Sequence, residues 1–379
     1  MKYILAVIIF SLSQLCFADS QIDMLTKRIE QLEKQQSDIL FESSQSGSHV
    51  YSFLKDGLTL GGFFESSYTL LQGPGTKFQA TNSTNLLGLN LAAEFSNDLH
   101  FVSQFVTGLS IPLQNSHNDP RAAIKRREYS GVGFGAVLTQ GFLEYSVNDH
   151  THVQFGFGYV PFGFAAQQRE IVLFVRRSGP QILRTTELLS PLWSGFNFRQ
   201  RFNSGSKVWG YNIYTFTRFE DPKIPGVGGR TWWTSNEERF MTGLSLQTAK
   251  YRGEIEEVVG ADVKIRFSNF VITSEYARHL SDHMKDPWSA YIEPGYFIYQ
   301  EEILLYTFVD YSESTLNKTG TLSDPYHKFE FGGGVNWLPT SYTRLRLGLT
   351  YNDYVHDRAV VQGQNRDYAS VDLSVGVAF

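Results

Sequence analysis

The sequence predicts an antiparallel transmembrane β-barrel of about sixteen strands, preceded by a short N-terminal coiled-coil helix. Two observations lead to this fold class. The chain ends in an alternating segment, in which Val371, Leu373, Val375, Val377 and Phe379 are apolar and the residues between them are polar or small. Since successive side chains of a strand point to opposite faces, the last strand has one apolar face. The other end of the chain resembles an export sequence.

Residues 1–18 are expected to be a signal peptide. An apolar run begins just after Lys2, and a cleavage site with small residues precedes Asp19. The run is too short to span a membrane as a helix. A lipid anchor on Cys16 is the alternative. Because the sequence holds one cysteine, cleavage before Asp19 would leave a mature chain without disulfides or thiol catalysis.

The composition favours a barrel over a helical membrane protein. The chain has 30 Phe, 20 Tyr and 6 Trp among 379 residues, and aromatic residues populate the interfacial girdles of such barrels. Charged residues make up 19%, and no stretch after the signal approaches the roughly 20 apolar residues that a spanning helix needs. A closed barrel lets so polar a chain cross lipid, because each strand satisfies the backbone of its neighbours. The net charge of −5 implies no basic surface for nucleic acid.

Residues 19–41 are expected to form a coiled coil. Apolar side chains recur with the 3-4 spacing of a coiled-coil seam, and charged residues fill the outer positions. The seam consists of Ile22, Leu25, Ile29, Leu32 and Ile39. An amphipathic helix packed on its own domain is the alternative. A linker rich in Ser and Gly, residues 42–56, leads to the barrel, residues 57–379.

Fifteen alternating segments are recognisable between Leu58 and Phe379. Tight turns and long connections alternate between them, which is typical of outer-membrane barrels. A barrel whose two ends lie on one side of the membrane needs an even number of strands, so we expect a hidden strand between Lys250 and Val259. Residues 220–238 are expected to be a long loop. Sixteen strands of about 10 residues fit the chain length, with fourteen as the alternative.

Three phrases of the sequence support a family resemblance. They are Leu58-Thr-Leu-Gly-Gly-Phe-Phe64, Gly158-Tyr-Val-Pro-Phe-Gly163, and Gly260-Ala-Asp-Val-Lys264 with Ser274-Glu-Tyr276. With the order of signal, coiled coil, linker and barrel, the chain resembles the phosphate-selective porins of the OprO/OprP type and the DcaP-like channels. The resemblance implies a homotrimer in the bacterial outer membrane, with the coiled coil in the periplasm. It also implies passage of small anions such as phosphate or dicarboxylates.

The long connection 161–190 is the first candidate for lining the pore, whose selectivity depends on charges and loops at its narrowest section. It holds an apolar run, Ile171 to Val175, between charged residues. Folding against the inner wall of the mouth would remove this run from water. It would also carry four arginines into the lumen: Arg169, Arg176, Arg177 and Arg184. The alternative packs the run on a neighbouring subunit and places the arginines on lipopolysaccharide phosphates.

Two further sets of basic residues are candidates. The first lies on a long loop, where a charge run usually forms a solvated or lipopolysaccharide-facing surface, with pore lining as the alternative. Its members are Arg121, Lys125, Arg126 and Arg127. The second set follows from strand phase, because a charge on the lipid face near the midplane costs about 2–4 kcal/mol. The residues predicted to face the lumen are Arg199, Arg201, Lys264, Arg266, Arg344 and Arg346.

Acidic residues are expected on the same inner face, among them Glu94, Glu144 and Glu275, so opposed rows of charges can pair. We nevertheless expect a net preference for anions. The expected function is a passive diffusion channel for small hydrophilic solutes, without enzymatic activity, cofactor or metal. The phrase Gly131-Val-Gly-Phe-Gly-Ala136 matches a loose dinucleotide fingerprint, but no strand–helix unit surrounds it. A structural barrel with a coiled-coil spacer and a plugged pore, and a lipolytic or proteolytic barrel, remain as alternatives.

Overall fold

The structure is a computed structural model, and it describes the barrel strands and some of their connections. The described residues are 58–72, 79–112, 133–165, 190, 192–205, 207–217, 223–235, 239–251, 254–280, 287–299, 302–314, 326–340, 342–356 and 367–379. The expected signal peptide, coiled coil and linker lie outside them. So do the basic residues of the two long loops, Arg121 to Arg127 and Arg169 to Arg184.

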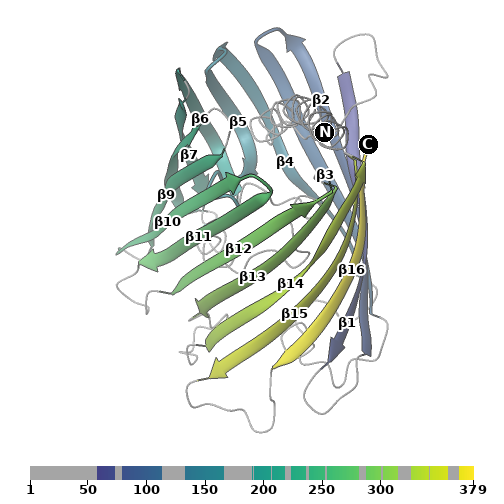
Figure 1. The fold of residues 1–379 in the computed structure, drawn as a ribbon. Coiled ribbons are helices and arrows are strands. Elements are labelled where there is room, and N and C mark those ends of the chain that lie inside the picture. The colour runs from purple at the N-terminus through teal and green to yellow at the C-terminus, as the bar shows by residue number, and fades with distance from the viewer. Residues whose placement is uncertain are drawn as a thin grey trace, which may run out of the picture. The chain divides into compact units, whose positions relative to one another are not determined.

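Sixteen antiparallel strands close into one barrel, as predicted, and each strand pairs with its neighbours in sequence (Figure 1). The strands are β1 (Leu58–Gln72), β2 (Gln79–Ser96), β3 (Leu99–Pro112), β4 (Gly133–Asn148), β5 (Thr151–Tyr159), β6 (Leu192–Ser204), β7 (Lys207–Thr217), β8 (Pro225–Ser235), β9 (Phe240–Tyr251), β10 (Glu254–Phe267), β11 (Phe270–Leu280), β12 (Trp288–Ile298), β13 (Ile303–Ser314), β14 (Tyr326–Thr340), β15 (Thr343–His356) and β16 (Tyr368–Ala378). No helix among the described residues is long and apolar enough to span a membrane.

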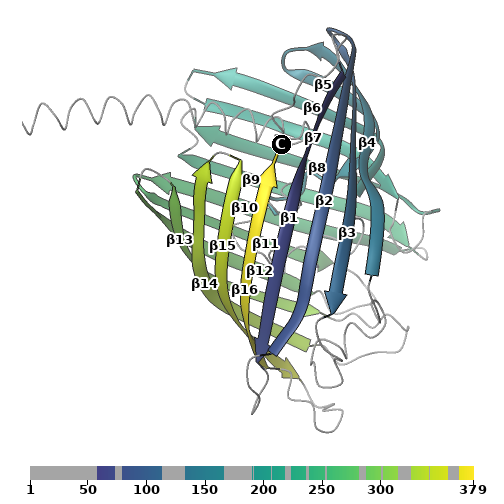
Figure 2. The same ribbon diagram turned by 90° about the vertical axis from the view of Figure 1, so that its right-hand side faces the viewer.

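The first and last strands close the barrel. Figure 2 shows β1 between β16 and β2, and the register of the closing pair runs from Phe63 opposite Ala378 to Gln72 opposite Ala369. Closure leaves none of the sixteen described strands with an unpaired edge, which a barrel in lipid requires. We call the end of the barrel that carries Leu58 and Phe379 the turn end, because its connections are short, and the opposite end the loop end.

The two faces of the strands differ as strand phase predicts. On β15 the outward side chains Leu347 and Leu349 are 47% and 59% exposed, whereas Arg346 and Thr350 face inward and are buried. This alternation places apolar side chains towards lipid and polar side chains towards the lumen in a transmembrane barrel.

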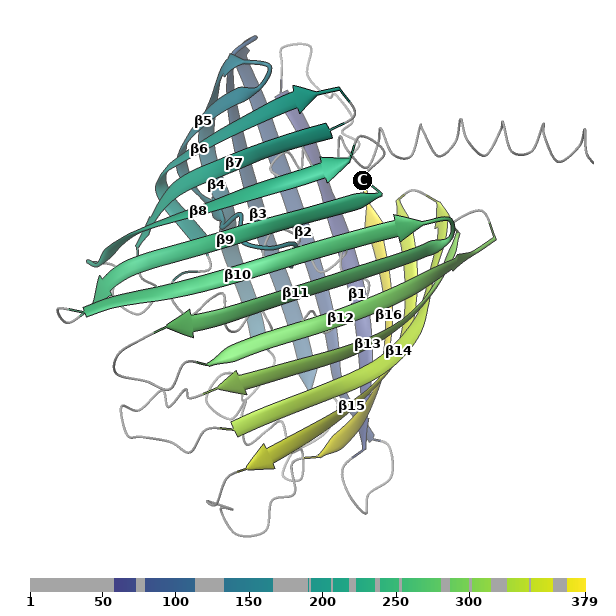
Figure 3. The same cartoon turned by 60° about the vertical axis from the view of Figure 1, so that its left-hand side comes forward.

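The expected position of the hidden strand is wrong. Residues 250–251 end β9 and residues 254–259 begin β10, and the two strands pair directly at Tyr251 and Glu254. The sixteenth strand is β8, which lies between β7 and β9 (Figure 3) in the segment expected to be a long loop. Its glycines resemble turn signals in the sequence. In the barrel, Gly226 and Gly228 lie beneath the rings of Phe216 and Tyr214, where a Cβ atom would overlap ring carbons.

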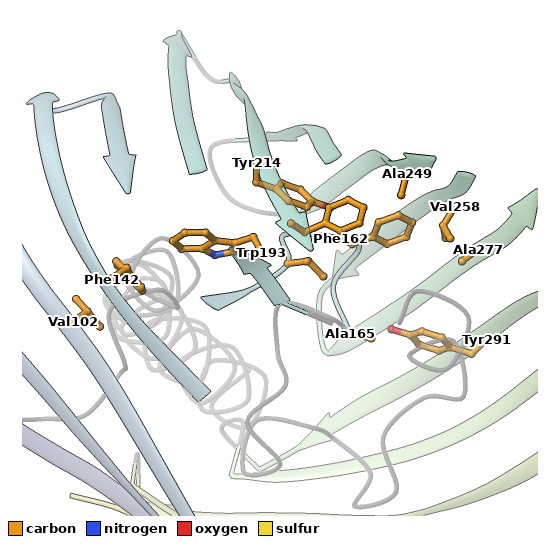
Figure 4. Close-up of a cluster of buried hydrophobic side chains, with 12 residues drawn as sticks. Val102, Phe142, Phe162, Ala165, Trp193, Tyr214, Ala249, Val258, Ala277 and Tyr291 are labelled. Carbon is orange, nitrogen blue, oxygen red and sulfur yellow. The ribbon is translucent and has the colours of Figure 1, made fainter. Parts of the chain in front are cut away.

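The lumen contains an apolar cluster, which the prediction of a polar interior did not include. Inward-facing side chains of β3, β4, β6, β7 and β9 to β12 form it with residues that follow β5 (Figure 4). Its members are Val102, Phe142, Val160, Phe162, Ala165, Trp193, Tyr214, Phe216, Ala249, Val258, Ala277 and Tyr291. The cluster brings the chain that leaves β5 onto the inner wall formed by β9, β10 and β11.

Candidate pore-lining site

The connection between β5 and β6 begins inside the barrel. Val160, Phe162, Phe164 and Ala165 are between 1% and 4% exposed, and Figure 4 places Phe162 and Ala165 among side chains of the surrounding strands. This is where the sequence led us to expect a loop folded against the inner wall. The position of residues 166–189, with their four arginines, stays a prediction.

The start of this connection is fixed by contacts with three adjacent strands. The ring of Phe162 lies over Gly260 of β10, where a Cβ atom would overlap it. The backbone N–H of Gly163 donates to Ser245 Oγ of β9 at 3.2 Å. The backbone N–H of Ala165 donates to Glu275 Oε1 of β11 at 2.7 Å. We call these three contacts the loop anchor.

Glu275 is the buried acceptor at the centre of the loop anchor. The hydroxyl of Tyr291 on β12 donates to the same Oε1 atom at 2.6 Å. Gly163 has a positive φ of 60°, and a Cβ atom there would overlap Glu275 Oε2. Only glycine combines this backbone conformation with such a close approach. The carboxylate and the chain that turns past it are therefore fitted to each other.

A buried ion pair lies beside the loop anchor. Arg230 of β8 donates to Asp262 of β10 through Nη2 at 2.6 Å and through Nε at 3.3 Å. The pair passes over Gly243 of the intervening strand β9, where a Cβ atom would lie 2.7 Å from both side chains. The guanidinium also lies 5.3 Å from the ring centroid of Phe164. Sequence reasoning missed Arg230 because its strand had been assigned to a loop.

The six basic residues predicted from strand phase all lie on the inner face, but the structure does not bring them into one cluster. Arg199 lies 3.6 Å from Glu144, and Arg346 lies 2.8 Å from Glu65. Arg266 lies 5.5 Å from the ring centroid of Phe297. The remaining three, Arg201, Lys264 and Arg344, lie on the same inner faces of β6, β10 and β15.

These basic residues share one level of the barrel. Arg199 and Arg201 are near the end of β6, Lys264 and Arg266 are near the end of β10, and Arg344 and Arg346 are near the start of β15. Each of these strand termini is at the turn end. Basic side chains from three well-separated strands therefore surround the lumen close to its turn-end mouth.

On the inner face of the barrel, most of these basic side chains are more exposed to solvent than most of the acidic ones. Five of the six are partly exposed, namely Arg199, Arg201, Lys264, Arg266 and Arg344. Six acidic residues of the inner face are 3% exposed or less, namely Glu65, Glu144, Asp262, Glu275, Asp310 and Glu330. Glu256 and Asp372 are also buried, at 4% and 8%, which leaves Glu94 and Glu293 as the more exposed acids on the inner face of the described strands. On this inner face, the partly exposed charges near the turn-end mouth are thus mainly positive.

The comparisons with known proteins identify the fold. No family model and no curated protein matches the chain. Among solved structures, the anion-selective porin from Comamonas acidovorans is 12% identical, with a TM-score of 0.54 over 85% of this chain and 99% of that one. OmpF of Salmonella typhi, in complex with daunomycin, is 11% identical, with a TM-score of 0.56 over 86% and 99%. OmpT of Vibrio cholerae, an outer-membrane protein in a trimer form, is 9% identical, with a TM-score of 0.51 over 86% and 100%. At these identities the likeness shows a shared porin-type barrel fold.

Proposed function

We propose that this protein is a channel of the bacterial outer membrane through which small hydrophilic solutes diffuse passively, with a preference for anions. The observation that carries the proposal is the partly exposed basic belt at the turn-end mouth, Arg199, Arg201, Lys264, Arg266 and Arg344, on the inner wall of a closed barrel. Charged side chains that line a pore select among ions by attraction and repulsion. Phosphate or dicarboxylates are the solutes that we expect.

The loop arginines belong to the same proposal. Ala165 lies on the inner wall, and Arg169, Arg176, Arg177 and Arg184 follow it within the connection to β6. A connection that starts inside the lumen supports the placement of these arginines in the constriction. The basic loop that holds Arg121, Lys125, Arg126 and Arg127 is assigned to the outer surface, where lipopolysaccharide phosphates are the partners.

The location and assembly complete the proposal. Residues 1–18 direct export, the coiled coil of residues 19–41 lies in the periplasm, and the turn end faces the periplasm. Three copies assemble, as the resemblance to porins implies and as the trimer form of the Vibrio cholerae barrel supports for that fold. The mature mass, starting at Asp19, and the native mass in detergent test these two points.

The test of the main proposal is a planar-bilayer measurement with the purified full chain. We expect open channels whose reversal potential under a potassium chloride gradient shows a preference for chloride, and whose chloride current falls when phosphate or succinate is added. Cation selectivity would overturn the anion preference. Absence of open channels would overturn the proposal that the protein is a channel.

A plugged structural barrel is the second candidate. Its favouring observation is that inner-wall side chains on three strands, Gln247, Ser289 and Asp310, are 0% exposed. The bilayer measurement separates the two candidates, because a plugged barrel conducts no steady current. We propose no catalytic activity, and hydrolysis of a fluorogenic acyl ester by the purified protein would contradict this.

A further inference from the structure

We propose that Glu275 is a positioning residue, which holds the start of the β5–β6 connection on the inner wall and thereby sets the width of the pore. The part that concerns pore width rests on the proposed channel function. The part that concerns the position of the connection rests on the loop anchor alone.

The geometry gives Glu275 this role. Its Oε1 atom accepts two hydrogen bonds, from the Ala165 backbone at 2.7 Å and from the Tyr291 hydroxyl at 2.6 Å. The side chain is 3% exposed, so water does not replace these bonds readily. A buried donor that loses its acceptor is costly, so the Ala165 N–H depends on this oxygen.

The neighbouring contacts explain why Glu275, rather than the anchor's other members, controls the connection. Phe162 and Gly163 are held on β10 and β9 by ring packing on Gly260 and by a 3.2 Å hydrogen bond to Ser245. Ala165 is the last described residue before the segment that carries the four arginines, and Glu275 is its acceptor. Glu275 therefore sets the point from which the arginine-bearing segment departs.

Contacts with the inner wall also constrain the direction in which the chain continues after Ala165. Gly163 must pass Glu275 without a Cβ atom, and Phe164 lies beside the Arg230 guanidinium. Removing the carboxylate would free Ala165 from β11 while the earlier contacts remain. The connection would then pivot about residues 162–163 and move away from the wall.

Limited trypsin digestion of the folded protein in detergent tests the position of the connection. Cleavage after Arg169, Arg176, Arg177 and Arg184, followed by mass spectrometry, reports how often the segment becomes accessible. We expect Glu275→Ala to be cleaved about tenfold faster than wild type, the factor that loss of one buried hydrogen bond gives when the protease cuts an opened state. Glu275→Gln keeps an acceptor oxygen and is expected to remain within about twofold of wild type.

Two further variants test whether faster cleavage is specific to the loss of the Glu275 carboxyl group. Asp372→Ala removes another buried carboxylate of the inner wall, which accepts from Thr69 of β1 and Ser370 of β16, and should leave cleavage unchanged. Tyr291→Phe removes one donor without opening a cavity, and should leave the Ala165 bond intact. Should Glu275→Ala fail to fold, Glu275→Leu replaces it, because leucine removes both acceptor oxygens and leaves a smaller cavity. A wild-type cleavage rate in Glu275→Leu would overturn the proposal.

Single-channel conductance supplies the second readout. Glu275→Ala should conduct more than wild type, whereas Asp372→Ala, which removes another buried carboxyl group, should not. Wild-type cleavage rates in Glu275→Ala, or equal rates in its Gln and Ala variants, would overturn the positioning role even if the channels open. Faster cleavage in a protein that never conducts would instead uphold the positioning role and refute the channel.

Discussion

Gly62 and Phe379 exchange both of their backbone hydrogen bonds, with N···O distances of 2.7 and 2.9 Å. The ring of Phe379 lies over Gly62, with ring carbons 3.0 and 3.1 Å from the position that a Cβ atom would take. The last residue of the chain therefore completes the β1–β16 pair, and its side chain uses the space that the glycine leaves. Sequence reasoning recognised the terminal Phe but not its partner.

Substitution of Gly62 tests this fit. Gly62→Val would bring a side chain against the Gly88 carbonyl oxygen as well as the Phe379 ring, so the backbone would have to shift. We expect a loss of about 1–3 kcal/mol in the free energy of unfolding, which is the usual cost of overpacking. Denaturant unfolding of the refolded protein in detergent measures it. Leu60→Val on the same outward face, where the side chain is 46% exposed, is the control, and an equal loss there would contradict the specific fit.

The basic belt predicts a change in ion selectivity. The triple variant Arg199→Gln, Arg266→Gln and Arg344→Gln removes three partly exposed charges from the turn-end mouth. We expect its anion-to-cation permeability ratio to fall, because pore-lining charges set the local concentration of permeant ions. Reversal potentials under a salt gradient measure this ratio.

Lys207→Gln is the matched control for the belt. Lys207 is exposed at the start of β7, at the same end of the barrel, but it points outward. Its loss should leave the permeability ratio unchanged. A triple variant with wild-type selectivity would show that the belt does not govern permeation.

The Arg230–Asp262 pair predicts an asymmetry between single and double substitution. The two side chains are 6% and 1% exposed, so Asp262→Ala would leave an uncompensated buried charge. We expect a cost of about 3–5 kcal/mol in the free energy of unfolding. The double variant Arg230→Met with Asp262→Leu should recover most of this loss, because buried ion pairs are often no more stable than apolar replacements. Equal losses in the single and double variants would argue against the pair.

The glycines of β8 predict a compensating pair of substitutions. Gly228→Val should cost about 1–3 kcal/mol of unfolding free energy, since the new side chain would meet the buried ring of Tyr214. Adding Tyr214→Ala removes the ring, so the valine should cost less in that background than in wild type. A double-mutant cycle of denaturant unfolding measures the coupling, and additive effects would contradict the fit of ring to glycine.

The sequence was sufficient for the barrel and for the phase of its strands. Apolar residues at every second position, as in Leu345, Leu347 and Leu349, decide which face meets lipid, so the inward direction of Arg344 and Arg346 followed from local pattern alone. Strand β8 was missed because the residues that identify it as a strand are not all within its own segment. Gly226 and Gly228 are strand residues only because rings from β7 cover them.

The loop anchor shows a similar limit. Folding of residues 161–190 into the lumen was expected from the apolar run at Ile171, whereas the described contacts involve Phe162, Gly163 and Ala165. The partners of these residues, Ser245 and Glu275, are 82 and 110 residues away in the sequence. Such pairings depend on barrel register, which one sequence does not reveal. The same holds for Arg230 and Asp262, which are brought together across β9.

The partly exposed cationic side chains near the turn-end mouth give the inner face of the described strands a charge that differs from one end of the barrel to the other. Anions that approach from the turn side meet a region where their concentration is raised. A channel whose two ends differ in charge carries currents of different size at voltages of opposite sign. The direction in which the current–voltage curve departs from a straight line would show in which orientation each channel had inserted into the bilayer.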